Sequence, residues 1–156
     1  MNQLQKEGRE FTATLECEHL NEPEDPVARL DLTRAYPLSE LTNFRRSFHV
    51  NRSGHIITLI DEFSFNRLPD QLEEAFITFA LAEIIDNGLG VKLTRHGETL
   101  MLRAQQPGMF ESRFVAAPGK MTETCSPDHP DQPGFFRIGF KPETLAETMR
   151  LSFIFE

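Results

Sequence analysis

Strict alternation of apolar and polar residues is the feature that most constrains this chain. Apolar residues occupy every second position from Phe11 to Cys17, from Phe136 to Phe140 and from Met149 to Phe155. The same period runs from Phe44 to Val50, where Arg46 is the only charged residue on the apolar side. A period of two places successive side chains on opposite faces of a strand, so the pattern predicts half-buried β-strands.

The turn residues Asn51–Gly54 indicate a hairpin between residues 44–50 and 57–65. A two-residue turn at Ser53–Gly54 places Arg46 opposite Asp61. The second strand of this hairpin is largely apolar on both faces, which predicts a central position in its sheet. A further hairpin is predicted around Arg95–Glu98 by the same kind of pattern.

Residues 72–86 fit two structures. Asp70, Glu73 and Gly88 supply the start and stop signals of a helix, whereas the apolar residues from Ala75 to Leu81 recur with a period of two. The local signals favour a helix slightly, and so short a stretch cannot be decided by periodicity. Because the surrounding segments are strand-like and no linker or repeat divides the chain, we predict an all-β fold. We expect a two-layer antiparallel β-sandwich that forms a single domain over residues 1–156.

The composition narrows the classes of function. Lys and Arg number 16 against 24 acidic residues, and this surplus of negative charge argues against a nucleic-acid partner. The longest nearly apolar run, Ala75–Ala82, is far shorter than the roughly 20 residues that cross a bilayer, and no signal peptide is visible. We therefore predict no membrane partner and leave the compartment open. Fourteen Phe, one Tyr and no Trp indicate a Phe-rich interior rather than an aromatic carbohydrate-binding platform.

The metal-ligand types in the sequence are too few for a recognisable metal site. Cys17 and His19 would share one face of a strand, but a zinc site needs further ligands at a suitable spacing. We interpret Cys17 as a small buried residue and His19 as a residue at the edge of a loop. Cys17 and Cys125 allow one disulfide at most; sequence leaves the bridge open, and two buried thiols are favoured. No metal or cofactor is predicted in this chain.

Two carboxylates stand next to each other at Asp61 and Glu62. On a strand they point to opposite faces, so they cannot act together on one substrate atom. Arg46 and Asp61 lie instead on the apolar faces of paired strands. A charge there must be paired, because its uncompensated burial costs several kcal/mol. We predict a structural ion pair between them.

The remaining candidates also favour structural or solvated roles. Tyr36 is the only phenol and a potential general base, but we favour a packed Tyr whose hydroxyl donates to a backbone carbonyl. The other histidines are scattered over turns and strand surfaces and are expected to be solvated: His49, His55, His96 and His129. A basic cluster could meet an acidic sugar, although a solvated or partner-facing edge is favoured: Arg45, Arg46 and Arg52. No catalytic residue is predicted.

Six short motifs occur in a recognisable order: GREFTA at 8–13, ARLDLTRAYP at 28–37, FRRSF at 44–48, LIDEF at 59–63, FITF at 76–79 and FRI at 136–138. Together they resemble the later part of the β-sheet domain in the heparinase II/III-like family. The resemblance runs from about Gly8 to the end of the chain. Its most specific part is the block Asp31–Pro37, since alternating strands are generic.

The resemblance implies a polysaccharide lyase in which an α-helical toroid precedes a β-sandwich. Such enzymes abstract a proton next to a uronate carboxylate and then eliminate the glycosidic oxygen. No catalytic or metal-binding motif of the family matches a position here, so none is carried over. The resemblance also implies that residues 76–85 are strand. We expect an accessory domain that is inactive alone and whose partner is the rest of a parent lyase.

Two alternatives stay open. One is a stand-alone carbohydrate-binding module, for which an acidic polysaccharide is the expected ligand. The other is a protein-interaction module that uses the acidic loop Glu22–Asp25 and its exposed strand edges. Exposed edges can recruit a partner strand or a second copy of the chain, so a homodimer is part of this alternative.

Overall fold

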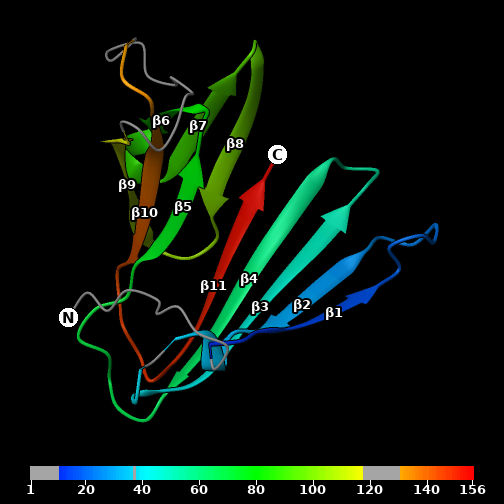
Figure 1. Cartoon of the computed structure of the whole chain (residues 1–156), viewed down its shortest axis with the longest axis vertical. Coiled ribbons are helices and arrows are strands. Elements are labelled where there is room, and N and C mark those ends of the chain that lie inside the picture. Colours follow the sequence, from blue (N-terminus) through cyan, green and yellow to red (C-terminus); the bar gives the residue numbers. More distant parts are fainter. Residues whose placement is uncertain (1–10, 37, 118–130) are drawn as a thin grey trace. The chain divides into compact units, whose positions relative to one another are not determined.

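The computed structural model describes residues 11–36, 38–117 and 131–156, which form antiparallel strands and two short 3-10 helices (Figure 1). The predicted all-β class is confirmed. Within these ranges no helix combines the length and hydropathy that a membrane span requires. The chain divides into two compact units: unit 1 comprises Met1–Gln71 and Leu145–Ile154, and unit 2 comprises Leu72–Thr144 and Phe155–Glu156. The single domain expected from the sequence stays a prediction.

Unit 1 is built on one sheet with the strand order β1-β2-β3-β4-β11. Its elements are β1 (Thr14–Glu18), β2 (Val27–Asp31), the 3-10 helix η1 (Thr33–Ala35), β3 (Leu41–Asn51), β4 (Ile56–Phe65) and β11 (Thr148–Phe155). β4 lies between β3 and β11, which confirms the central position predicted from its two largely apolar faces. Its more deeply buried face carries Leu59, Asp61 and Phe63.

The β3–β4 hairpin has the predicted register, in which Arg46 pairs with Asp61. Its turn differs from the prediction. β3 ends at Asn51 and β4 begins at Ile56. Residues 52–55 therefore form a four-residue loop instead of a two-residue turn at Ser53–Gly54. The Asn51 carboxamide oxygen accepts a hydrogen bond from the Gly54 amide at 2.7 Å and closes this loop. The register is unchanged because the longer loop removes one residue pair symmetrically.

β1 corrects the prediction of a half-buried strand over residues 11–17. The strand begins at Thr14, and all five of its residues are exposed, Leu15 by 61%. Cys17 is therefore an exposed free thiol and not a buried small residue. Alternation correctly indicates a strand, but it does not show whether another layer covers the apolar row. Cys125 lies outside the described residues, so its burial and the possible disulfide stay untested.

Aromatic rings fill the buried side of unit 1, as the Phe-rich composition suggested. The Phe44 and Phe63 rings stack with centroids 4.4 Å apart, and Phe65 continues this row 6.0 Å from Phe63. Tyr36 also packs against Phe44, with centroids 5.5 Å apart. These contacts tie the segment after η1 to the centre of the β3–β4 hairpin.

Unit 2 contains two sets of paired strands, β8-β7-β6 and β5-β10-β9. Its elements are β5 (Glu74–Thr78), β6 (Leu81–Ile85), the 3-10 helix η2 (Asp86–Gly88), β7 (Gly90–Arg95), β8 (Glu98–Ala104), β9 (Gly108–Ala116) and β10 (Gly134–Pro142). The two sets contact each other where β6 and β7 meet β9 and β10. Phe110, Ile138 and Phe140 are buried in this core.

Residues 72–86 contain strands and not the helix that their local signals favoured. The single strand expected over 76–85 is interrupted, because β5 ends at Thr78 and β6 begins at Leu81. The Thr78 hydroxyl accepts a hydrogen bond from the Ala80 amide at 3.0 Å and stabilises this break. The β7–β8 hairpin is as predicted, with His96 and Gly97 both at positive φ in its two-residue turn.

Candidate functional site

The buried ion pair predicted for unit 1 is confirmed. Arg46 Nε donates to Asp61 Oδ1 at 2.7 Å, and Arg46 Nη2 donates to Asp61 Oδ2 at 2.6 Å. Asp61 is completely buried, and the Arg46 side chain is 23% exposed with its guanidinium 5.6 Å from the Phe44 ring centroid. Both carboxylate oxygens are bound and shielded from solvent, so the pair is a structural contact within the hairpin and does not offer a carboxylate to a substrate.

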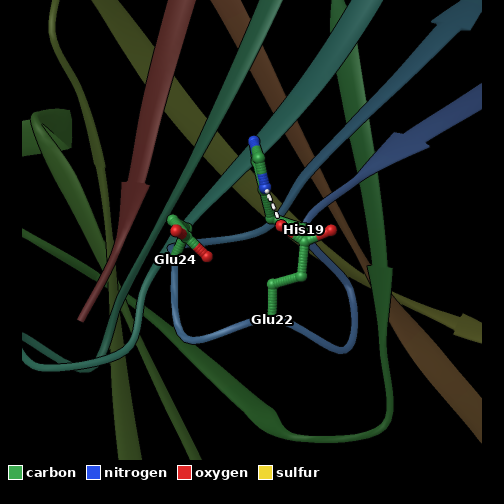
Figure 2. Close-up of side chains that lie close together, drawn as sticks. All are labelled: His19, Glu22 and Glu24. Carbon is green, nitrogen blue, oxygen red and sulfur yellow. Dashed lines mark hydrogen bonds and ion pairs between the residues drawn. The ribbon is translucent and has the colours of Figure 1, made fainter.

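A cluster in the β1–β2 loop is the arrangement of the described residues that most resembles a cation site (Figure 2). The potential ligand atoms of His19, Glu22 and Glu24 all lie within 4.8 Å of one another. His19 follows the last residue of β1 and has a φ of 57°, so it leaves the strand. This corrects the prediction that Cys17 and His19 share a strand face, and Cys17 is not part of the cluster.

Arg52 from the β3–β4 loop holds the backbone that carries this cluster. Its Nη1 donates to the Glu22 carbonyl at 2.7 Å and its Nη2 donates to the Leu20 carbonyl at 3.0 Å. The Arg52 amide donates to Asp25 Oδ1 at 3.0 Å. Its guanidinium is thus engaged by the loop, and that of Arg46 is engaged by Asp61. The basic cluster proposed from the sequence is therefore not one surface, since only Arg45 of its three members is exposed and outside such a contact.

The electrostatics of the cluster favour a proton on His19. His19 Nδ1 lies 2.8 Å from Glu22 Oε2, and this hydrogen bond raises the pKa of the imidazole, helped by Glu24 and Glu18. His19 and Glu22 are 43% and 60% exposed, so solvent screens these interactions. A protonated imidazole has no lone pair for a metal, and a cation would have to displace the proton. The prediction that this chain holds no metal stays a prediction.

The potential acid–base residues lie on separate elements. In unit 1, Tyr36 packs on Phe44, His49 lies on β3 and His55 occupies the β3–β4 loop at positive φ. His96 belongs to the β7–β8 turn of unit 2, and His129 lies outside the described residues. Glu62 is exposed while Asp61 is buried, which confirms that the two carboxylates point to opposite faces. The hydrogen bond expected from the Tyr36 hydroxyl to a carbonyl stays a prediction.

A row of charges on the outward face of the sheet β5-β10-β9 was not predicted from the sequence. Arg137 of β10 lies directly opposite Arg113 of β9, and Arg137 also forms an ion pair with Glu73. Lys141 Nζ lies 2.8 Å from Glu111 Oε2, which raises the pKa of Lys141 and lowers that of Glu111. The alternation of positions 137, 139 and 141 with the apolar residues Phe136, Ile138 and Phe140 was visible in the sequence. The pairing of β9 with β10, which joins two distant segments, was not.

Comparison with known proteins finds no matching family model and no matching curated protein. Solved structures of the heparan sulfate lyase HepC from Pedobacter heparinus do match. One gives a TM-score of 0.64 at 13% identity, covering 92% of this chain and 21% of that one. A mutant of HepC gives a TM-score of 0.63 at the same identity and coverage. The chain thus shares the fold of about one fifth of a heparan sulfate lyase, and the likeness at this identity concerns the fold alone.

Proposed function

We propose that this chain is an accessory β-sandwich domain of a larger polysaccharide lyase of the heparinase II/III-like kind. The observation that carries the proposal is the match of nearly the whole chain to one fifth of HepC. In this role the domain completes the β-sheet region and braces a catalytic toroid. Proton abstraction beside a uronate carboxylate and elimination of the glycosidic oxygen are carried out by residues of the toroid and of the preceding β-region.

The placement of the side chains supports a non-catalytic role. Elimination needs a base next to a group that neutralises the uronate carboxylate. Arg46 is paired with Asp61, Arg52 is bound to loop carbonyls, and Tyr36 packs into an aromatic row. All three side chains are thus engaged in contacts within the fold.

An absorbance assay for unsaturated uronate products tests the catalytic part of the proposal. The chain alone is expected to give no product from heparan sulfate or other uronate-containing polysaccharides. Turnover by the chain that disappears in a Tyr36→Phe variant would contradict the proposal. Heat-treated protein and an active lyase serve as the negative and positive controls.

The coding sequence that adjoins this one tests the structural part. An adjoining segment that encodes an α-helical toroid with candidate Tyr and His bases supports an accessory domain. In that case, deletion of these 156 residues from the longer protein should reduce its stability and activity together. A frame that encodes only this chain would contradict the proposal.

The exposed edge strand β1 favours a protein-interaction module as the second candidate. β1 pairs with β2 and, within the described part of the chain, with no other strand. Its five exposed residues leave backbone donors and acceptors open to a further strand. Light scattering tests self-association: a dimer that a Leu15→Lys variant abolishes supports this candidate, and a strict monomer contradicts a homodimer through β1.

A further inference from the structure

Two arginines lie opposite each other on the outward face of β5-β10-β9 in unit 2. The register pairs Arg137 with Arg113 across the neighbouring strands β10 and β9. Like charges at directly opposite positions of an antiparallel pair destabilise a sheet. Glu73 neutralises Arg137, whereas Arg113 is exposed and has no ion-pair partner among the described residues. The pair therefore keeps one positive charge that no ion pair within residues 11–36, 38–117 and 131–156 balances.

The strand pattern shows that this face is turned away from the core. Phe136, Ile138 and Phe140 of β10 are buried, so the alternate residues Arg137 and Lys141 point outward. On the same face, Ile77 of β5 lies opposite Arg137 and is 57% exposed. The face thus combines guanidinium groups with an open apolar side chain on a pleated surface.

Gly139 leaves space at the centre of this face, because it has no side chain there. A Cβ atom at this position would lie 2.2 Å from Glu73 Oε1, so the glycine leaves the space that the Glu73 carboxylate occupies on its way to Arg137. The Glu73 carboxylate is therefore an internal example of an anionic group bound on this face. Arg113 presents the same fork of N–H donors beside it, and in the described part of the chain no carboxylate pairs with it.

We propose that this face binds an acidic polysaccharide, with Arg113 and Arg137 holding one of its carboxylate or sulfate groups. Lys141 lies four residues along β10 from Arg137 on the same face, where it can contact a neighbouring charge on the polymer, and Ile77 contacts a sugar ring. This face carries three positive charges and two carboxylates, those of Glu73 and Glu111. It is therefore locally positive, although the whole chain carries a charge of −8. The choice of a polysaccharide over another polyanion rests on the proposed function.

Calorimetric titration of the full chain with a size-defined heparan sulfate oligosaccharide tests this site. The Arg113→Gln variant is expected to bind about tenfold more weakly, since it loses a charge-assisted contact. Arg150→Gln is the matched control, because Arg150 is an exposed arginine on β11 of unit 1 without an ion pair in the described chain. Its affinity is expected to stay within about twofold of the unmodified protein.

A gain-of-binding variant separates a binding role from a structural one. Glu73→Gln releases Arg137 for the ligand and is expected to raise the affinity several-fold, while a purely structural role for Glu73 predicts no such gain. Glu147→Gln removes the same charge from an exposed position of unit 1 and is expected to leave the affinity unchanged. Thermal unfolding of each variant shows that the protein is folded during the titration.

Several outcomes overturn the inference. One is failure of the unmodified chain to bind the oligosaccharide, and another is binding by Arg113→Gln with the same affinity as the unmodified chain. The third such outcome is a loss of affinity in Arg150→Gln equal to that in Arg113→Gln. Equally tight binding of poly-glutamate would replace the polysaccharide with an acidic polypeptide as the ligand and so overturn the stated class. No binding together with an adjoining toroid sequence overturns only this site. Binding without such a sequence overturns only the assignment to a lyase.

Discussion

Both carboxylate oxygens of Asp61 accept hydrogen bonds from the Arg46 guanidinium, and the Asp61 side chain is completely buried. Replacing it leaves the Arg46 charge largely buried beside a cavity, which typically costs about 3 kcal/mol when a buried pair is broken. For a chain of this size we expect Asp61→Ala to lower the melting temperature by roughly 6–12 °C. Differential scanning calorimetry measures this change.

Glu62→Ala is the matched control for that prediction, because Glu62 is the neighbouring carboxylate on the exposed face of the same strand. Its unfolding free energy should change by less than about 0.5 kcal/mol. An Arg46→Met, Asp61→Leu double variant should recover much of the loss, since no charge is then left buried. An unchanged melting temperature in Asp61→Ala would show that the pair contributes nothing to stability.

His19 gives a prediction of pH dependence. Its pKa is raised mainly by the hydrogen bond to Glu22, so its contribution to stability is fully present below the unfolded value of about 6.5. The contribution is lost as the pH rises through the folded pKa. NMR titration should show the pKa of His19 above that value, with a decrease in Glu22→Gln. The same pKa in both proteins would contradict the contact.

The sequence predicted the Arg46–Asp61 pair because both charges interrupt apolar rows whose relative register a short loop fixes. It gave no indication of the Arg113–Arg137 pair, since residues 114–136 separate the two arginines. It also failed for His19, whose positive φ takes it out of the β1 strand. Local patterns determine which residues share a strand face, whereas contacts between distant strands depend on tertiary packing.

At the scale of elements, the close pairing of β9 with β10 requires glycine at both ends of their register, at Gly108 and Gly134. A Cβ at Gly134 would lie 2.5 Å from the Val115 carbonyl oxygen and 2.5 Å from the Phe114 ring. Backbone cannot move aside as a flexible side chain can, so Gly134→Ala should destabilise the protein by about 1–3 kcal/mol. Urea unfolding measures the loss.

Gly54→Ala is the control for this substitution. A Cβ at Gly54 meets only the Asn51 side chain, at 3.2 Å, which can shift. Equal stability of the two alanine variants would show that the approach of β9 to β10 at Gly134 is not a constraint.

The segment 72–86 shows why an element can be predicted wrongly from local signals. Its helix signals were outweighed by the pairing of β5 with β10 and of β6 with β7.

For the whole molecule, the path of the chain matters as much as its strand content. Unit 1 takes residues from both ends of the sequence, because β11 adds to β4 after the chain has passed through unit 2. Leu151 and Phe153 of β11 are almost completely buried. Neither unit is therefore one continuous piece of sequence, which alternation alone could not reveal.

A fragment of residues 1–71 should consequently lack cooperative unfolding, because its central strand β4 becomes an edge strand and loses its pairing with β11. Thermal unfolding followed by circular dichroism tests this expectation. A synthetic peptide of residues 145–156 added to the fragment should partly restore the transition. A fragment that unfolds as sharply as the full chain would show that β11 is dispensable for unit 1.

The exposed strand β1 has a practical consequence for handling the protein. The exposed Glu16 carboxylate discourages a second molecule from extending the sheet at neutral pH, whereas the charge of Glu18 is balanced by Arg29. Acid neutralises that repulsion, while the backbone of the strand stays as open as before. Purification and storage in acidic buffers should therefore favour growth of insoluble β-rich aggregates, and mildly alkaline buffers of low ionic strength should keep the preparation clear.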